Sequence, residues 1–158
     1  MAELHEMQYN HNIVAELLTP DGALRDIFVP NTSFEDWNNV LESLRNSDYG
    51  LEFLVDSEPA QLPKRVEEIF AIDNLKTLKV KLDNIHFNSY FFVDDEIDFD
   101  IDPRDFVAFE QSEDLVNFMR FLSNSTNKPS ILTPELSQEY ILMKVQPNNL
   151  DIEVKNGM

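Results

Sequence analysis

A run of acidic side chains in residues 94–105 is the first place to look for chemistry in this sequence. The run contains Asp94, Asp95, Glu96, Asp98, Asp100, Asp102 and Asp105. The spacing from Asp98 to Asp102 is that of the first ligands in an EF-hand calcium loop. Such a loop also needs a glycine at its sixth position and a glutamate at its twelfth, where this sequence has Pro103 and Phe109. We therefore expect no calcium site in this segment.

The same spacing has a second interpretation, as a β-strand with its acids on one face. Apolar and acidic residues alternate in the order Ile97, Asp98, Phe99, Asp100, Ile101, Asp102. Because successive side chains of a strand point to opposite faces of the sheet, this pattern predicts apolar side chains inside and aspartates outside. Aligned like charges repel. Lys79 and Lys81 would relieve the repulsion if the 78–82 strand lay beside the 97–102 strand.

Acids that are not paired in this way would form either a solvated face or a surface that binds a partner protein. Alternation assigns Tyr90 and Phe92 to the face opposite Phe91, so that a helix must cover them or they form an exposed aromatic patch beside the acids. Aromatic anchors are typical of protein recognition surfaces. The candidate partner-binding residues are therefore His86, Tyr90, Asp94, Asp95, Glu96, Asp98, Asp100 and Asp102.

Other kinds of site lack the residues that they need. Three glycines in the whole chain cannot build a phosphate-binding loop, and the absence of cysteine excludes disulfides and thiolate sites. The three histidines, His5, His11 and His86, have no metal-ligand spacing, so we expect neither metal nor cofactor. There is no Gly-x-Ser-x-Gly motif. A glycosidase-like pair of carboxylates stays open, because any two of the 30 acids could meet across a cleft.

The charge of the chain limits its partners. It has 30 acidic and 12 basic residues and a formal net charge of -18. Such a charge repels nucleic acid and anionic membranes and attracts basic protein surfaces. Residues 1–6 have no apolar signal-peptide region, and no run approaches the roughly 18 apolar residues of a membrane-spanning helix. We therefore expect a cytoplasmic protein with no membrane contact.

The first part of the chain predicts a hairpin and a helix. Residues 1–12 are a polar lead-in, and two apolar runs at 13–18 and 24–29 are joined by Pro-Asp-Gly, a typical turn sequence. Thr32 and Glu35 fit a capping box that opens a helix. Its core side chains follow at helical spacing: Phe34, Trp37, Val40, Leu41 and Leu44.

The rest of the chain predicts mostly hairpins. In order, the expected elements are a strand at 51–55, a turn at 59–63, a short helix within 62–70, a β-meander at 78–102, a helix capped by Ser112, a polar loop at 123–130, and a hairpin of 140–145 and 150–154. Hairpins favour antiparallel pairing. The predicted fold class is therefore α+β, a single domain over 1–158 with a mainly antiparallel sheet and two main helices packed on one face.

Three functional hypotheses follow from these features. The first is an interaction protein, such as an inhibitor or immunity-type protein that binds a basic toxin or nuclease of the same bacterial cell. The second is a DNA mimic that competes for nucleic-acid-binding proteins. The third is a hydrolase that uses acidic residues together with His86. We favour the first, since opposite charge accelerates the capture of a partner and no catalytic motif is present.

Overall fold

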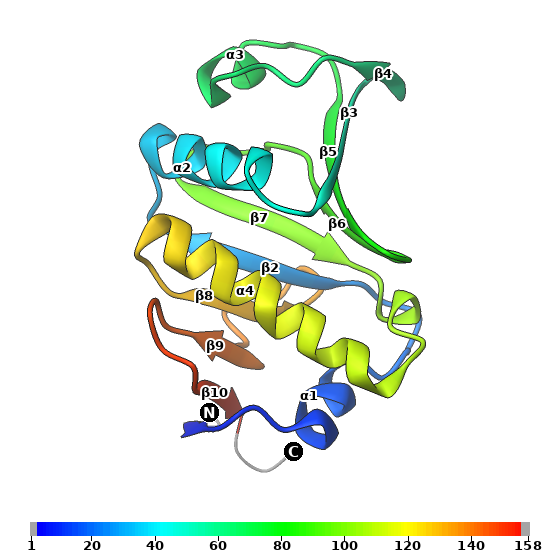
Figure 1. Ribbon diagram of the computed structural model, residues 1–158, viewed down its shortest axis with the longest axis vertical. Coiled ribbons are helices and arrows are strands. Elements are labelled where there is room, and N and C mark those ends of the chain that lie inside the picture. Colours follow the sequence, from blue (N-terminus) through cyan, green and yellow to red (C-terminus); the bar gives the residue numbers. More distant parts are fainter. Residues whose placement is uncertain (1–2, 156–158) are drawn as a thin grey trace.

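The computed structural model describes residues 3–155, and in them ten strands form one antiparallel sheet (Figure 1). The strands lie in the order β1-β10-β9-β8-β2-β7-β6-β5-β3-β4. Their bounds are β1 Leu4–Met7, β2 Arg25–Pro30, β3 Gly50–Val55, β4 Glu58–Ala60, β5 Lys76–Leu82, β6 Ile85–Ser89, β7 Glu96–Ile101, β8 Ser130–Pro134, β9 Met143–Val145 and β10 Ile152–Lys155. The two middle strands, β2 and β7, come from distant parts of the chain.

The α-helices gather on one face of this sheet (Figure 1). The two main helices, α2 (Phe34–Arg45) and α4 (Ser112–Thr126), contact each other above the central strands, and α1 (His11–Leu17) packs against α4. The short helix α3 (Val66–Phe70) contacts α2. Two single 3-10 turns, η1 (Pro103–Asp105) and η2 (Phe109–Gln111), connect β7 to α4. The predicted α+β class, with its antiparallel sheet and two main helices on one face, is confirmed.

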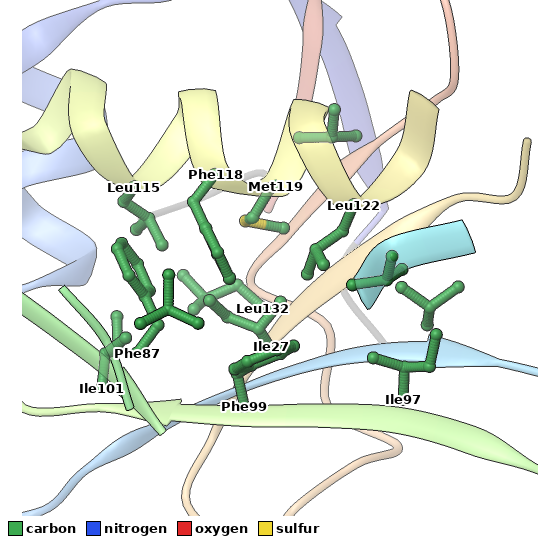
Figure 2. Packing of buried hydrophobic residues seen from close by; sticks show 14 of the residues in the cluster. Ile27, Phe87, Ile97, Phe99, Ile101, Leu115, Phe118, Met119, Leu122 and Leu132 are labelled. Carbon is green, nitrogen blue, oxygen red and sulfur yellow. The ribbon is translucent and has the colours of Figure 1, made fainter. Parts of the chain in front are cut away.

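Aromatic and branched side chains fill the space between the helices and the sheet. Figure 2 shows Phe118, Met119 and Leu122 of α4 pointing toward Ile27 and Phe99 of the central strands. Phe118 stacks on Phe87 with ring centroids 3.9 Å apart. Trp37, from α2, is fully buried and lies 4.8 Å from the ring of Phe91. The helical spacing of 34–44 therefore does place Trp37, Val40, Leu41 and Leu44 in the core, whereas Phe34 at the start of α2 is exposed.

The β-meander is confirmed, with one change in its second strand. β5, β6 and β7 are neighbours in that order. The second strand ends at Ser89, short of the predicted alternation through Val93. Phe91 has a positive φ of 55°, a backbone conformation that breaks the strand. Asp83, in the turn between β5 and β6, also has a positive φ.

The predicted N-terminal hairpin is wrong, because its first strand is the helix α1. Val14, Leu17 and Leu18 are buried at helical spacing, and a short apolar run is compatible with either period. Asn10 decides between them, since its side chain accepts hydrogen bonds from the N–H groups of Asn12 and Ile13 and so caps a helix. The second predicted strand is β2, which pairs with β7 and β8.

Several boundaries also differ from the prediction. Residues 4–7 of the lead-in form β1, which pairs with β10. The α2 cap is Ser33 with Asp36, one residue after the predicted pair. Ser112 is the first residue of α4 and not its cap, and the helix continues to Thr126, into the predicted polar loop. No helix in residues 3–155 is long and apolar enough to span a membrane.

Candidate functional site

Strand pairing brings three aspartates together on the sheet face that points away from the helices. In the register of β2 and β7, Asp26 of β2 lies directly opposite Asp100 of β7. Asp98 lies two residues before Asp100 in β7. On the other side of β7, Asn88 of β6 lies opposite Asp100. Directly opposite side chains in a sheet have Cβ atoms about 5 Å apart. We call Asp26, Asp98 and Asp100 the acidic face.

The acidic face is only partly satisfied by hydrogen bonds. The N–H of Leu136 donates to Asp26 Oδ2 at 3.0 Å, and Asn88 Nδ2 reaches Asp100 Oδ1 at 3.5 Å. Asp98 Oδ1 and Asn88 Oδ1 are buried without a hydrogen-bond partner. None of the salt bridges within residues 3–155 includes one of the three aspartates. The site therefore has more acceptors than donors.

Burial and mutual repulsion change the acidity of these carboxyls. Burial, together with the smaller effects of the nearby charges of Glu96, Asp100 and Asp26, raises the pKa of Asp98 to about 6. Burial likewise raises the pKa of Asp100 to about 6 against the hydrogen bond from Asn88. The pKa of Asp26 is also raised, mainly by burial. At neutral pH the carboxylates of Asp98 and Asp100 are therefore ionised at a cost in free energy.

The lysines do not relieve this repulsion. β6 lies between β5 and β7, so the 78–82 strand is not beside the 97–102 strand and the condition for this relief is not met. Lys81 Nζ instead binds Glu52 Oε1 at 2.9 Å on β3. Lys79 lies opposite Asn88, one strand away from the acids. Lys79 and Lys81 therefore do not neutralise the aspartates of β7 in this structure.

Two aromatic rings adjoin the acidic face. Tyr90 and Phe92 are stacked with ring centroids 5.6 Å apart and an interplanar angle of 28°. Phe92 is 70 % exposed, whereas Phe91 between them is buried. Burial raises the pKa of Tyr90, and the charges of Asp100 and Asp98 add to it, which places the phenol beside the acids. Of the two alternatives for these rings, the exposed aromatic patch is the one found.

The other candidate residues lie around the acidic face in different environments. Glu96 accepts a hydrogen bond from Gln138, and Asp94 and Asp95 are exposed in the loop before β7. Asp102 is bound to Arg104 at 2.7 Å, which lowers its pKa. His86, on β6, lies opposite Lys81 of β5 and away from Asp98. The structure therefore brings Asp98, Asp100 and Tyr90 together. Asp102 is close enough for its charge to raise the pKa of Asp100, but it is paired with Arg104.

The sequence prediction missed Asp26, Asn88 and the segment after β8. Asp26 alternates with the buried Ile27 and Val29, so its outward direction was readable, but its pairing with β7 was not. The segment after β8 lies against the same face, since Leu136 N–H bonds Asp26 and Gln138 bonds Glu96. Leu136 itself has a positive φ and is 90 % exposed.

Four hollows in the surface lie away from the acidic face. Volumes of about 940 and 660 Å³ lie between α2 and residues 61–68, and volumes of about 300 and 290 Å³ lie beside the end of α1. None of these four is lined by a residue of the acidic face. Among the described residues, no group of three or more histidines and acids is arranged to hold a metal ion.

No protein-family model, curated protein or solved structure matches the chain.

Proposed function

We propose that the protein is an interaction protein whose acidic face binds a basic surface of a partner protein. The observation that carries the proposal is the set of three adjacent carboxylates, Asp26, Asp98 and Asp100, with no cationic side chain bound to them within residues 3–155. An arginine or lysine of a partner would supply the missing positive charge. A basic enzyme such as a nuclease is a partner of suitable chemistry.

The electrostatics of the face favour such a partner. The pKa values of about 6 for Asp98 and Asp100 reflect burial and like charge, and an opposite charge nearby lowers the pKa of a carboxyl. A docked cation would therefore relieve the repulsion and release bound protons near pH 6. The net charge of -18 adds long-range attraction, which accelerates association and makes it sensitive to salt.

The aromatic pair gives the face a second means of contact. Phe92 is 70 % exposed and stacked on Tyr90 beside the acids. A guanidinium or ammonium group lies favourably over an aromatic ring, and exposed aromatic side chains are enriched among the residues that dominate binding energies. Rings and carboxylates together suit an arginine-rich surface better than a lysine-rich one, because guanidinium groups stack on rings and bind carboxylates through two hydrogen bonds.

A charge-matched comparison tests this proposal. One variant combines Asp26→Asn, Asp98→Asn and Asp100→Asn. Its control neutralises the same number of exposed acids at Asp48, Glu68 and Asp73, which lie away from β2 and β7. Fluorescence anisotropy measures the affinity of each for a synthetic peptide of alternating arginine and glycine.

We expect the acidic-face variant to bind the peptide about tenfold more weakly than the control, since three lost charge contacts at roughly 0.5 kcal/mol each amount to one decade. Equal weakening in both variants would mean that bulk charge alone attracts the peptide, as in a DNA mimic without a defined docking site. Such a result would refute the acidic face as the binding surface.

The hydrolase hypothesis has one observation in its favour. Carboxyls with raised pKa values are typical of acid-base catalysts, and Asp98 and Asp100 have them. These side chains are half-buried, however, and line none of the four hollows. Substrates are usually held in a concave site, so the geometry supports docking better than hydrolysis.

A further inference from the structure

A small hollow lies where the end of α1 meets the start of α4. It has a volume of about 300 Å³ and is lined by Ala15, Leu18, residues 19–20, residues 106–109 and Ser112. This volume is at the lower end of the range of roughly 300–1,000 Å³ found for small-molecule sites. Val107 and Phe109 at the hollow are 79 % and 49 % exposed. The hollow therefore leaves apolar surface in water that a bound molecule would cover.

A polar group is held in the wall of this hollow. Ser112 is 2 % exposed, and its hydroxyl is hydrogen-bonded to the hydroxyl of Tyr9, which is also bonded to His11 Nδ1 at 2.7 Å. The imidazole in turn packs on Phe109 with ring centroids 5.3 Å apart. The contacts of Tyr9, His11 and Phe109 therefore fix the position of the Ser112 hydroxyl.

Ser112 keeps the capacity for another hydrogen bond. A serine hydroxyl has one donor and two acceptor positions, and within residues 3–155 the Ser112 hydroxyl bonds only Tyr9. If Tyr9 donates to His11, Ser112 donates to Tyr9 and its lone pairs stay free to accept. If His11 donates to Tyr9, the Ser112 proton is free instead. In both arrangements a ligand can make one hydrogen bond here.

Charge restricts the ligand further. None of the described residues that line the hollow is charged, so a cationic ligand would lose its hydration without forming an ion pair with a lining residue. Glu113 and Asp114 directly follow Ser112, and their charges add to burial in raising the pKa of Tyr9. An anion would be repelled by them and by the net charge of -18. The remaining class of ligand is neutral.

We propose that this hollow is a binding site for a small, neutral, mostly apolar molecule that makes one hydrogen bond with Ser112. The site is independent of the proposed docking function, since none of its lining residues belongs to the acidic face. The segment 106–109 covers the ligand from one side and the end of α1 from the other.

A pair of nearly isosteric probes tests the proposal by NMR. Indole has one N–H group, and indene has the same two-ring shape without a hydrogen-bonding group. Titration of the ¹⁵N-labelled protein with each should produce saturable shifts confined to residues near 15–20 and 106–112. We expect indole to bind about fivefold more tightly than indene, as one hydrogen bond of ordinary net strength would produce.

Three variants sharpen the test. Ser112→Ala should remove the preference for indole and leave indene binding unchanged. Ala108→Trp, at an exposed rim position, should fill the hollow and abolish the binding of both probes. Asn39→Trp, in the hollow beside α2, is the matched control and should change neither.

The expected results are distinct from those that would overturn the site. Absence of saturable shifts, shifts that map to another surface, or full binding by Ala108→Trp would each refute it. If Ser112→Ala does not fold, the indole-to-indene ratio in the unaltered protein still decides whether a hydrogen bond contributes, and a ratio of one would refute the role of Ser112.

Discussion

The substitution Asp98→Asn tests whether the acidic face destabilises the folded protein at neutral pH. The folded-state pKa of Asp98 is raised to about 6, above the ordinary value near 3.8. A raised carboxyl pKa means that stability from this group is fully present below about pH 4 and is lost as pH rises to about 6. At pH 7.5 the ionised carboxylate therefore lowers the free energy of unfolding, and an uncharged asparagine should not.

The size of the effect follows from the pKa shift. A shift of about 2 units corresponds to roughly 3 kcal/mol at most, at 1.36 kcal/mol per unit. The side chain is partly exposed and its charge is coupled to that of Asp100, so we expect a gain of about 1–2 kcal/mol at pH 7.5. The difference between variant and unaltered protein should disappear at pH 4, where Asp98 is protonated.

Urea denaturation at a series of pH values between 4 and 8 measures this difference. Asp102→Asn is the matched control, because Asp102 lies one position beyond β7 but is bound to Arg104, which lowers its pKa. Its stability contribution has the opposite sign, so this substitution should slightly lower the free energy of unfolding at pH 7.5. The reasoning fails if Asp98→Asn lowers stability at pH 7.5, or if its effect is the same at pH 4.

Four further changes test the core and the loops. Trp37→Ala should lower the free energy of unfolding by roughly 3–5 kcal/mol, because Trp37 is fully buried against Phe91 and Phe99; a near-neutral result would exclude it from the core. Ser89→Ala should raise thermal stability by about 1 kcal/mol, since the Ser89 hydroxyl is buried without a hydrogen-bond partner. Arg25→Met should cost roughly 2–3 kcal/mol in chemical denaturation, because the Arg25 guanidinium donates to the carbonyls of Leu17, the last residue of α1, and of Thr19 in the loop that follows. Added EDTA or millimolar calcium should leave the melting temperature unchanged, and a calcium-dependent rise of several degrees would reveal a bound ion.

Local patterns in the sequence were sufficient for the helices α2 and α4 and for the meander. The alternation of Ile97, Phe99 and Ile101 with aspartates identifies both the strand and its outward face, because a strand's side-chain period is fixed by its backbone. Short turns such as the one at Asp83 leave antiparallel neighbours as the only pairing. These elements were predictable because each depends on residues close together in the chain.

The sequence pattern did not determine whether short apolar runs form helices or strands. Residues 13–18 fit a strand and a helix equally well, and the hydrogen bonds of Asn10 to the first turn select the helix. β8 was missed because Ser130 and Thr133 interrupt its apolar pattern. Both residues are buried, and the Ser130 hydroxyl donates to the carbonyl of Met119 in α4. Polar residues of this kind become core residues only when the tertiary structure supplies partners.

The acidic face was likewise predictable in part from the sequence and in part only from the tertiary structure. The sequence determined that Asp98 and Asp100 point outward from a strand in a strongly acidic chain. Only the tertiary structure decided that Asp26 lies opposite Asp100 and that β6 keeps the lysines of β5 away. It also decided how deeply these carboxyls are buried, and hence their raised pKa values. The physical reason is that side-chain direction is a property of the local backbone, whereas neighbours and burial depend on which distant strands pair.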